Sequence, residues 1–364
     1  MIDYDILAKV PGQSEVIGYL CGMPIKSRMK LLGIITDDAK AAISKLPKEA
    51  LESLPDGPEI DTQTGQRLML AVSCFVESGR PVYRVGKELQ KAFVGMSLNK
   101  ITKEEVSLPE DGMYIDVENA DESIKLWGGD RTKWHVLRGI YAHKLPPGTT
   151  ANREGFVQGE CWQLMFWGAA NEESLNQQDD ALFYDIFSID TVFSNGIERH
   201  FKDILEDPSK DASPEGLRPP EGAERKKRNA GLIKALRIFI NTIPYVTGSN
   251  PEIGVGPETA RTNKLKAQVT RAKSPGKIAR IKRQINNATK CNVRVLAPSI
   301  ESAGISRKDG TAKHTVKAHW HRYWVGSSHE KYATGVLSND AGKRLVRLFV
   351  EEYTRGEDLT ERLK

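Results

Sequence analysis

The segment EDPSKDASPEGLRPPEGAERKKRN, residues 206–229, divides the chain into two parts. Four of its residues are proline, many are charged, and almost none is apolar. A segment of this composition cannot bury enough apolar surface to fold, so it is typical of a solvated linker. We therefore expect one domain at residues 1–205, a linker at 206–229 and a second domain at 230–364.

The first part has helical patterns followed by strand patterns. Amphipathic segments up to about residue 105 predict helices, including 36–47 with Thr36 at its N-cap, and 81–96. Strand-like composition follows in the runs MYIDV (113–117), VLRGIYAH (136–143), CWQLMFW (161–167) and ALFYDIFSI (181–189). Several of these runs are apolar on both parities, so we expect an antiparallel sheet that is covered on both faces.

The second part combines helices with strands. A helix is predicted at 231–243, and two basic helices at 259–273 and 274–288, the last with Ser274 as N-cap and Pro275 in its first turn. One apolar stripe runs along the first of these helices, made of Leu232, Leu236, Phe239, Ile240 and Ile243. A narrow apolar seam runs along the last, made of Ile278, Ile281 and Ile285.

Three strands are predicted to complete the chain, at 291–297, 314–325 and 343–353. The order of helices, strand, basic loop and strand is compatible with a winged-helix arrangement. The expected fold class is α+β: a helical N-terminal part with an antiparallel sheet, then a basic module of helices and a three-stranded antiparallel sheet.

Charge is distributed very unevenly along the chain. Residues 225–347 contain 26 Lys and Arg against 6 Asp and Glu, whereas the rest of the chain contains 27 against 42. Clustered positive charges repel one another, and contact with phosphates relieves this repulsion and releases the counterions of the phosphates. The pattern predicts a nucleic-acid partner, either DNA or RNA. The alternative is an acidic protein surface, including the acidic N-terminal part of this chain.

The candidate nucleic-acid contacts are basic and amide side chains, which can bind phosphates or base edges, together with one aromatic residue. Those on the second basic helix are Lys277, Arg280, Lys282, Arg283 and Asn286. Those in the following loop and strand are Arg307, Lys308, Lys313, Lys317 and Trp320.

The stretch HTVKAHWHRYWV at 314–325 also carries chemistry of a second kind. Alternation along a strand would place His319, His321 and Tyr323 on one face, and Arg322 could join them through a β-bulge. Two imidazoles beside a cation can cleave RNA by acid–base catalysis, so a metal-independent ribonuclease is an alternative function. A metal site would need a third ligand that the sequence does not offer, and structural hydrogen bonding is the remaining alternative.

The end of the chain resembles a known pattern. AHWHRYWVG followed by KRLVRLFVEEYTRGED, within about residues 290–358, is similar to the closing pattern of uncharacterised phage- and plasmid-borne proteins. In those proteins a glycine usually stands where this chain has Ala318. The resemblance implies a mobile-element context and supplies no catalytic residues.

These observations favour a nucleic-acid-binding protein of a phage or plasmid, with a regulatory, defence or counter-defence role. A third alternative is an inhibitor that binds a host protein through the acidic N-terminal part. The start of the sequence has neither the basic head nor the apolar run of a signal peptide, so we expect a cytoplasmic protein without membrane contact. The four scattered cysteines predict no zinc site or disulfide framework, no cofactor is expected, and the oligomeric state is left open.

Overall fold

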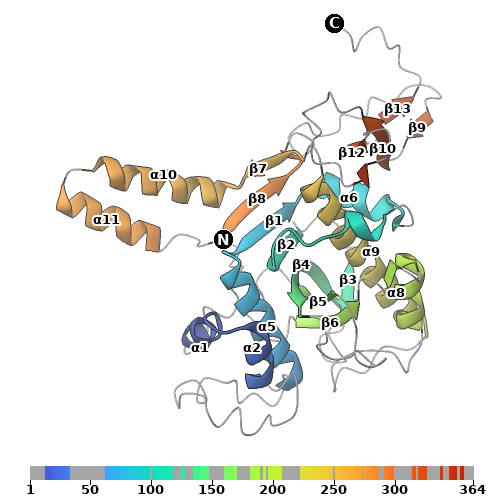
Figure 1. Ribbon diagram of the computed structural model, residues 1–364, viewed down its shortest axis with the longest axis horizontal. Helices are drawn as coiled ribbons and strands as arrows, with labels where there is room; N and C mark the ends of the chain where they lie inside the picture. Colours follow the sequence, from blue (N-terminus) through green and yellow to red (C-terminus); the bar gives the residue numbers. More distant parts are fainter. Residues whose placement is uncertain are drawn as a thin grey trace, which may run out of the picture.

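A mixed eight-stranded sheet forms the centre of the computed structural model (Figure 1). The strands follow the spatial order β6 (Ala181–Ser188), β5 (Cys161–Ala169), β4 (Trp134–Leu145), β2 (Gly112–Val117), β1 (Pro81–Val85), β8 (Asn292–Leu296) and β7 (Ile253–Val255), with β3 (Lys125–Trp127) paired to β4. The structure describes residues 13–32, 62–98, 101–117, 124–127, 134–146, 160–169, 181–188, 192–193, 196–206, 222–248, 251–272, 274–286, 291–298, 314–316, 319–325, 337–338, 344–350 and 353–355.

The predicted antiparallel sheet is confirmed for part of this assembly. The four runs identified in the sequence form β2, β4, β5 and β6, and each pairs with its neighbour in antiparallel register. The other half of the sheet is different, because β1 pairs in parallel with both β2 and β8. The sheet is therefore mixed, and the fold is α+β as predicted.

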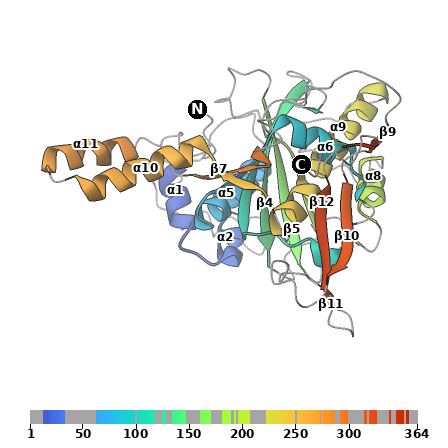
Figure 2. The same cartoon turned by 90° about the horizontal axis from the view of Figure 1, so that it is seen from above.

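Helices cover both faces of the sheet (Figure 2). One hydrophobic core includes buried residues of α1 (Gln13–Leu20), α2 (Ile25–Leu31) and α5 (Thr62–Glu77). The other includes buried residues of α6 (Lys87–Gly95), α8 (Ile197–Glu206) and α9 (Gly222–Thr247). A short 3-10 helix, Lys103–Glu105, follows α6 in the chain. This double cover explains why the strands are apolar on both parities.

The segment 81–96, predicted as one helix, forms a strand and then a helix. Pro81–Val85 is β1, Gly86 is the N-cap residue, and α6 begins at Lys87. The residues of β1 are β-branched or aromatic at three of five positions, which suits a strand buried between two others. The other predicted N-terminal helix, 36–47, lies outside the described residues.

The hydrophobic core continues across the boundary predicted from the linker composition. Helix α9 begins at Gly222, inside the range 206–229, and its predicted stripe from Leu232 to Ile243 is buried in the same core as β2, β4 and β5. Figure 1 shows α9 lying along the sheet. Strand β8 joins β1 in the central sheet, and its apolar Val293 and Leu296 are buried in the two cores on either side of it. The winged-helix prediction is wrong, since β8 pairs with β1 and β7 instead of the strand at 314–325.

The remaining strands form two small sheets. The predicted strand 314–325 is divided into β9 (His314–Val316) and β10 (His319–Val325). Strand β9 pairs with β13 (Tyr353–Arg355). Strand β10 pairs with β12 (Arg344–Val350), which also pairs with β11 (Leu337–Ser338), so a three-stranded antiparallel sheet does form. Two of the predicted strands, 314–325 and 343–353, contribute β10 and β12 to it, whereas β11 takes the place of the predicted strand 291–297.

A buried histidine in the core predicts acid sensitivity. His143 on β4 lies opposite Gln163 on β5, and neither of its ring nitrogens has a hydrogen-bond partner among the described residues. Burial, together with the charges of Arg67 and Arg28, lowers the pKa of His143 from 6.5 to about 3. The unfolded chain therefore binds a proton before the folded chain does, and stability falls as the pH drops from 6.5 toward 3.

His143→Leu should remove this loss of stability in acid. At pH 7 we expect its free energy of unfolding to stay within about 1 kcal/mol of wild type, because the neutral ring donates and accepts nothing that leucine would lose. In acid the variant should become the more stable protein, which urea denaturation between pH 7 and about 4.5 would measure. A difference between the two proteins that does not change with pH would contradict the argument.

Candidate nucleic-acid interface

Two helices project from the edge of the sheet as an antiparallel hairpin, and both views show it away from the rest of the molecule (Figures 1 and 2). Helix α10 spans Pro257–Arg271 and α11 spans Pro275–Asn286, starting at the proline that the sequence predicted. In chain order the hairpin lies between β7 and β8, which pair with each other. No residue of α10 is buried, so the protein body supports this helix only near its base.

The hairpin is held together by one apolar seam. On α10 the seam positions are Thr262, Leu265 and Val269, and on α11 they repeat the same spacing at Ile278, Ile281 and Ile285. Residues three and seven positions apart lie on one side of a helix, so each set faces the other helix. Ile281 is only 2% exposed and the other five are half-buried, which agrees with this placement.

Basic residues and two glutamines form a second stripe. On both helices its members lie one position before the seam residues, and Arg271 continues the stripe on α10. An antiparallel helix pair is related by a two-fold axis perpendicular to its plane, so equal offsets place the two stripes on the same side of the hairpin. All members of the stripe are exposed. We call this surface the cationic face; it consists of Arg261, Lys264, Gln268 and Arg271 on α10 and Lys277, Arg280 and Gln284 on α11.

The remaining cations of the hairpin lie elsewhere on its surface. Lys266 and Lys282 follow the seam by one position, so they lie on the side opposite the cationic face, and Arg283 points outward. The segment 257–286 contains nine Lys and Arg but a single acidic residue, Glu258. Among the described residues, none of the eight exposed cations on α10 and α11 forms an ion pair. The hairpin therefore carries positive charge without compensation from the part of the chain that the structure describes.

Close backbone packing fixes the base of the hairpin. The backbone N–H of Gly256, which precedes α10, donates to the carbonyl oxygen of Val293 at 2.9 Å. A Cβ at this glycine would lie 2.6 Å from the Val293 side chain, so a larger residue would push α10 away from β8. The hydroxyl of Thr259 accepts from the N–H of Val293 at 2.7 Å and donates to the carbonyl oxygen of Cys291 at 3.2 Å.

An arginine joins the base of the hairpin to the central sheet. Arg84 on β1 donates through Nε to Asp116 on β2 at 2.8 Å and through Nη2 to Glu258 in the first turn of α10, also at 2.8 Å. The side chain of Asp116 is 2% exposed and that of Arg84 is 13% exposed. Burial alone would raise the pKa of Glu258, but hydrogen bonds from Arg84 and from its own backbone N–H, together with the Arg84 charge, hold this pKa below its ordinary value. Glu258 is thus a charged anchor of the hairpin.

The structure places the predicted contacts of the second basic helix on α11. Lys277 and Arg280 lie on the cationic face, whereas Lys282 and Arg283 are exposed on other sides. Asn286 is the last residue of α11, and its side chain is outside the described part. Arg307, Lys308, Lys313 and Lys317 also lie outside the described residues, and their role stays a prediction. The sequence analysis did not identify the basic residues that α10 contributes to the cationic face, namely Arg261, Lys264 and Arg271.

The histidine-rich strand is present as β10, at the level of its backbone. His319 lies opposite Val350 of β12 and His321 lies opposite Leu348. Trp320, Arg322 and Tyr323 occupy the intervening and following positions, and the pairing between β10 and β12 runs without a register shift. The bulge that would bring Arg322 to the face of the two histidines is therefore absent from this pair of strands. The ribonuclease hypothesis stays a prediction.

Residues 83–345 of the 364-residue chain match the AcrVA2-like family, described as the anti-CRISPR type V subtype A2 family. The chain belongs to this family. An AcrVA2-like protein is a phage or mobile-element protein of counter-defence, which confirms the context that the C-terminal resemblance implied. The family match includes the sheet from β1 to β8, the hairpin, and β10.

Comparison with solved structures and curated proteins adds little to the assignment as an AcrVA2-like protein. The structure titled "Crystal structure of AcrVA2" is similar over 96% of this chain and 95% of that chain, with 13% sequence identity and a TM-score of 0.44. No curated protein matches the chain. Within the described residues, no helix of this AcrVA2-like chain is both long and apolar enough to cross a membrane.

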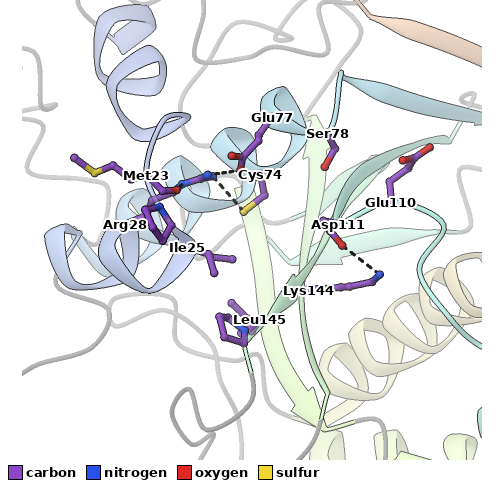
Figure 3. A pocket seen from close by; sticks show the side chains of 12 residues that line it. Met23, Ile25, Arg28, Cys74, Glu77, Ser78, Glu110, Asp111, Lys144 and Leu145 are labelled. Atoms are coloured by element: carbon purple, nitrogen blue, oxygen red, sulfur yellow. Dashed lines mark hydrogen bonds and ion pairs between the residues drawn. The ribbon is translucent and has the colours of Figure 1, made fainter.

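A pocket of about 510 Å³ lies between α2, the end of α5, the start of β2 and the end of β4 of this AcrVA2-like chain (Figure 3). Its charged groups are paired: Arg28 with Glu77, and Lys144 with Asp111 at 3.2 Å. Burial raises the pKa of Cys74, which also lines the pocket, to about 12, so the thiol stays protonated and is a poor nucleophile. No group of three or more potential metal ligands gathers among the described residues. The hairpin is therefore the better candidate for contact with phosphates.

Proposed function

We propose that this AcrVA2-like chain opposes a type V CRISPR system and does so in contact with nucleic acid, through the cationic face of the α10–α11 hairpin. Membership of the anti-CRISPR family supports the first part of the proposal. The observation that carries the second is the cationic face itself: five exposed Lys and Arg on one side of a projecting hairpin, without ion-pair partners among the described residues.

Physical chemistry gives a reason for such a surface. Cations gathered on one side of a thin hairpin repel one another, and this repulsion destabilises the free protein. A polyanion relieves it and gains entropy by releasing its condensed counterions. RNA-guided defence systems contain a guide RNA that pairs with target DNA, so nucleic acid is an integral component of what the family opposes.

Charge reversal on the two sides of the hairpin provides a matched test. In the full chain, R261E/R280E changes the cationic face, and K266E/K282E changes the opposite side by the same net charge and with one substitution in each helix. The face variant should bind a fluorescent nucleic acid at least about tenfold more weakly than the control variant at low salt. Its plot of log affinity against log salt should also lose about two units of slope relative to wild type.

Fluorescence anisotropy over a salt series would measure both quantities. Equal losses in the two variants would show that only the overall field matters, and would reject the cationic face as the contact. A wild-type protein without salt-dependent binding would reject nucleic-acid contact altogether. Because all four residues are exposed, thermal unfolding of both variants should remain close to that of wild type.

A further inference from the structure

We infer that the cationic face binds double-stranded rather than single-stranded nucleic acid. The inference depends on the proposed function, because it names the class of nucleic acid that the same surface takes. Two features of the hairpin lead to it: the cations lie in two rows, and the hairpin has no aromatic side chain on which a base could stack.

The two rows match two lines of phosphates. From Arg261 to Arg271 the row on α10 extends about 15 Å at 1.5 Å per residue. The row on α11, with Lys277 and Arg280, runs beside it at the separation of packed helices, about 8–10 Å. A single strand is one line of charge and can follow one row. The backbones that flank a groove of a duplex are two lines, about 6–12 Å apart in B-form DNA, and both rows can contact them together.

The hairpin lacks the residues that single strands require. Proteins that hold single-stranded nucleic acid combine cations with aromatic side chains, and each stacked base contributes about 1–3 kcal/mol. Residues 257–286 contain no Phe, Tyr, Trp or His. In a duplex the bases are already stacked on one another, so a surface that contacts phosphates alone loses nothing.

Two amides and a fixed base complete the surface. Gln268 and Gln284 lie seven positions after the first cation of their rows, so each helix presents an amide at the equivalent place. An amide can donate to a phosphate or to a base edge within a groove. The base of the hairpin is held by Gly256, Thr259 and Glu258, so the surface is already ordered before binding. A preordered surface suits a stiff duplex, because neither partner has to be reshaped.

Competition between matched probes tests the inference. The full chain would be titrated with duplexes of about 20 base pairs made of DNA or of RNA, and with the single strands of each. We expect at least one duplex to bind about tenfold more tightly than its own strands at the same salt concentration, with a salt slope near −4.5 for five phosphate contacts. R261E/R280E should remove this preference, and K266E/K282E should retain it.

The outcomes separate the two proposals. Single strands that bind as tightly as the duplexes, and lose affinity in R261E/R280E, would overturn the duplex inference while leaving the proposed function in place. A duplex preference that R261E/R280E does not reduce would overturn the assignment to this face. Absence of binding to all four probes would overturn both. The DNA and RNA arms identify which groove geometry is preferred, and a duplex preference in either one supports the inference.

Discussion

Residues 1–205 expressed alone are expected not to form a stable fold. The core on the α6 side of the sheet includes Leu232, Leu236 and Phe239 of α9, and all three lie beyond this boundary. A fully buried side chain of this kind stabilises a protein by about 1.5–3 kcal/mol, so losing α9 removes free energy comparable to the whole stability of a domain. Strand β1 would also lose β8 and become an exposed edge.

A split protein supplies the control. The gene can be divided so that residues 1–214 and 215–364 are expressed as two fragments, which leaves both α8 and α9 intact. Coexpression of these fragments should give a soluble complex that unfolds cooperatively. The 1–205 fragment alone should be insoluble or show no cooperative transition by circular dichroism. A soluble 1–205 fragment with a sharp thermal transition would show that the N-terminal part has a core of its own.

The sequence predicted the elements of this core better than their arrangement. The stripe on 231–243 was sufficient to identify the buried face of α9, because helical periodicity is local. The composition of 206–229 indicated a boundary, although α9 starts at Gly222 within it. Pairing of β8 with β1 joins residues about 210 positions apart, as in Val82 and Val293, and no local pattern records such a contact.

Strand β1 shows a different limit of prediction from sequence patterns. The segment 81–96 has enough apolar spacing to be read as one helix, and the structure shows that Gly86 separates a strand from a helix. Val82, Tyr83 and Val85 are all fully buried, as expected for a strand with neighbours on both edges and helices on both faces. Continuous burial removes the alternation that normally identifies a strand, so composition was the remaining signal.

The candidate site was predicted in part. Charge clustering directed attention to α11, where Lys277 and Arg280 are exposed, and their contact with nucleic acid stays a prediction. The equivalent residues of α10 could have been found from the same sequence, because both helices place a cation one position before each of their first two seam residues. The link from Arg84 to Asp116 and Glu258 could not, since it depends on three elements that meet only in the folded chain.

Arg84→Met should be among the most destabilising single substitutions in this region. The change removes a guanidinium that faces the buried carboxylate of Asp116 and the anchor Glu258, both at 2.8 Å. Removing one partner of a buried ion pair costs about 3–5 kcal/mol, because the other charge stays out of water. Urea denaturation at neutral pH would measure the loss of unfolding free energy. Glu258→Gln is the matched control for the exposed arm, and its cost should be about 1 kcal/mol, since this carboxylate is 23% exposed and its amide can still accept from Arg84.

The double variant R84M/D116L separates loss of the pair from loss of packing. Replacing a whole buried ion pair by apolar residues of similar size is often close to neutral, so the double variant should recover most of the stability that R84M loses. Recovery would mean that the penalty comes from the stranded Asp116 carboxylate. In that case the hairpin should remain attached through Gly256 and Thr259, because their contacts with β8 do not involve Arg84. A double variant as unstable as R84M would instead show that the packing of the arginine side chain and its ion pair with Glu258 hold β1, β2 and α10 together.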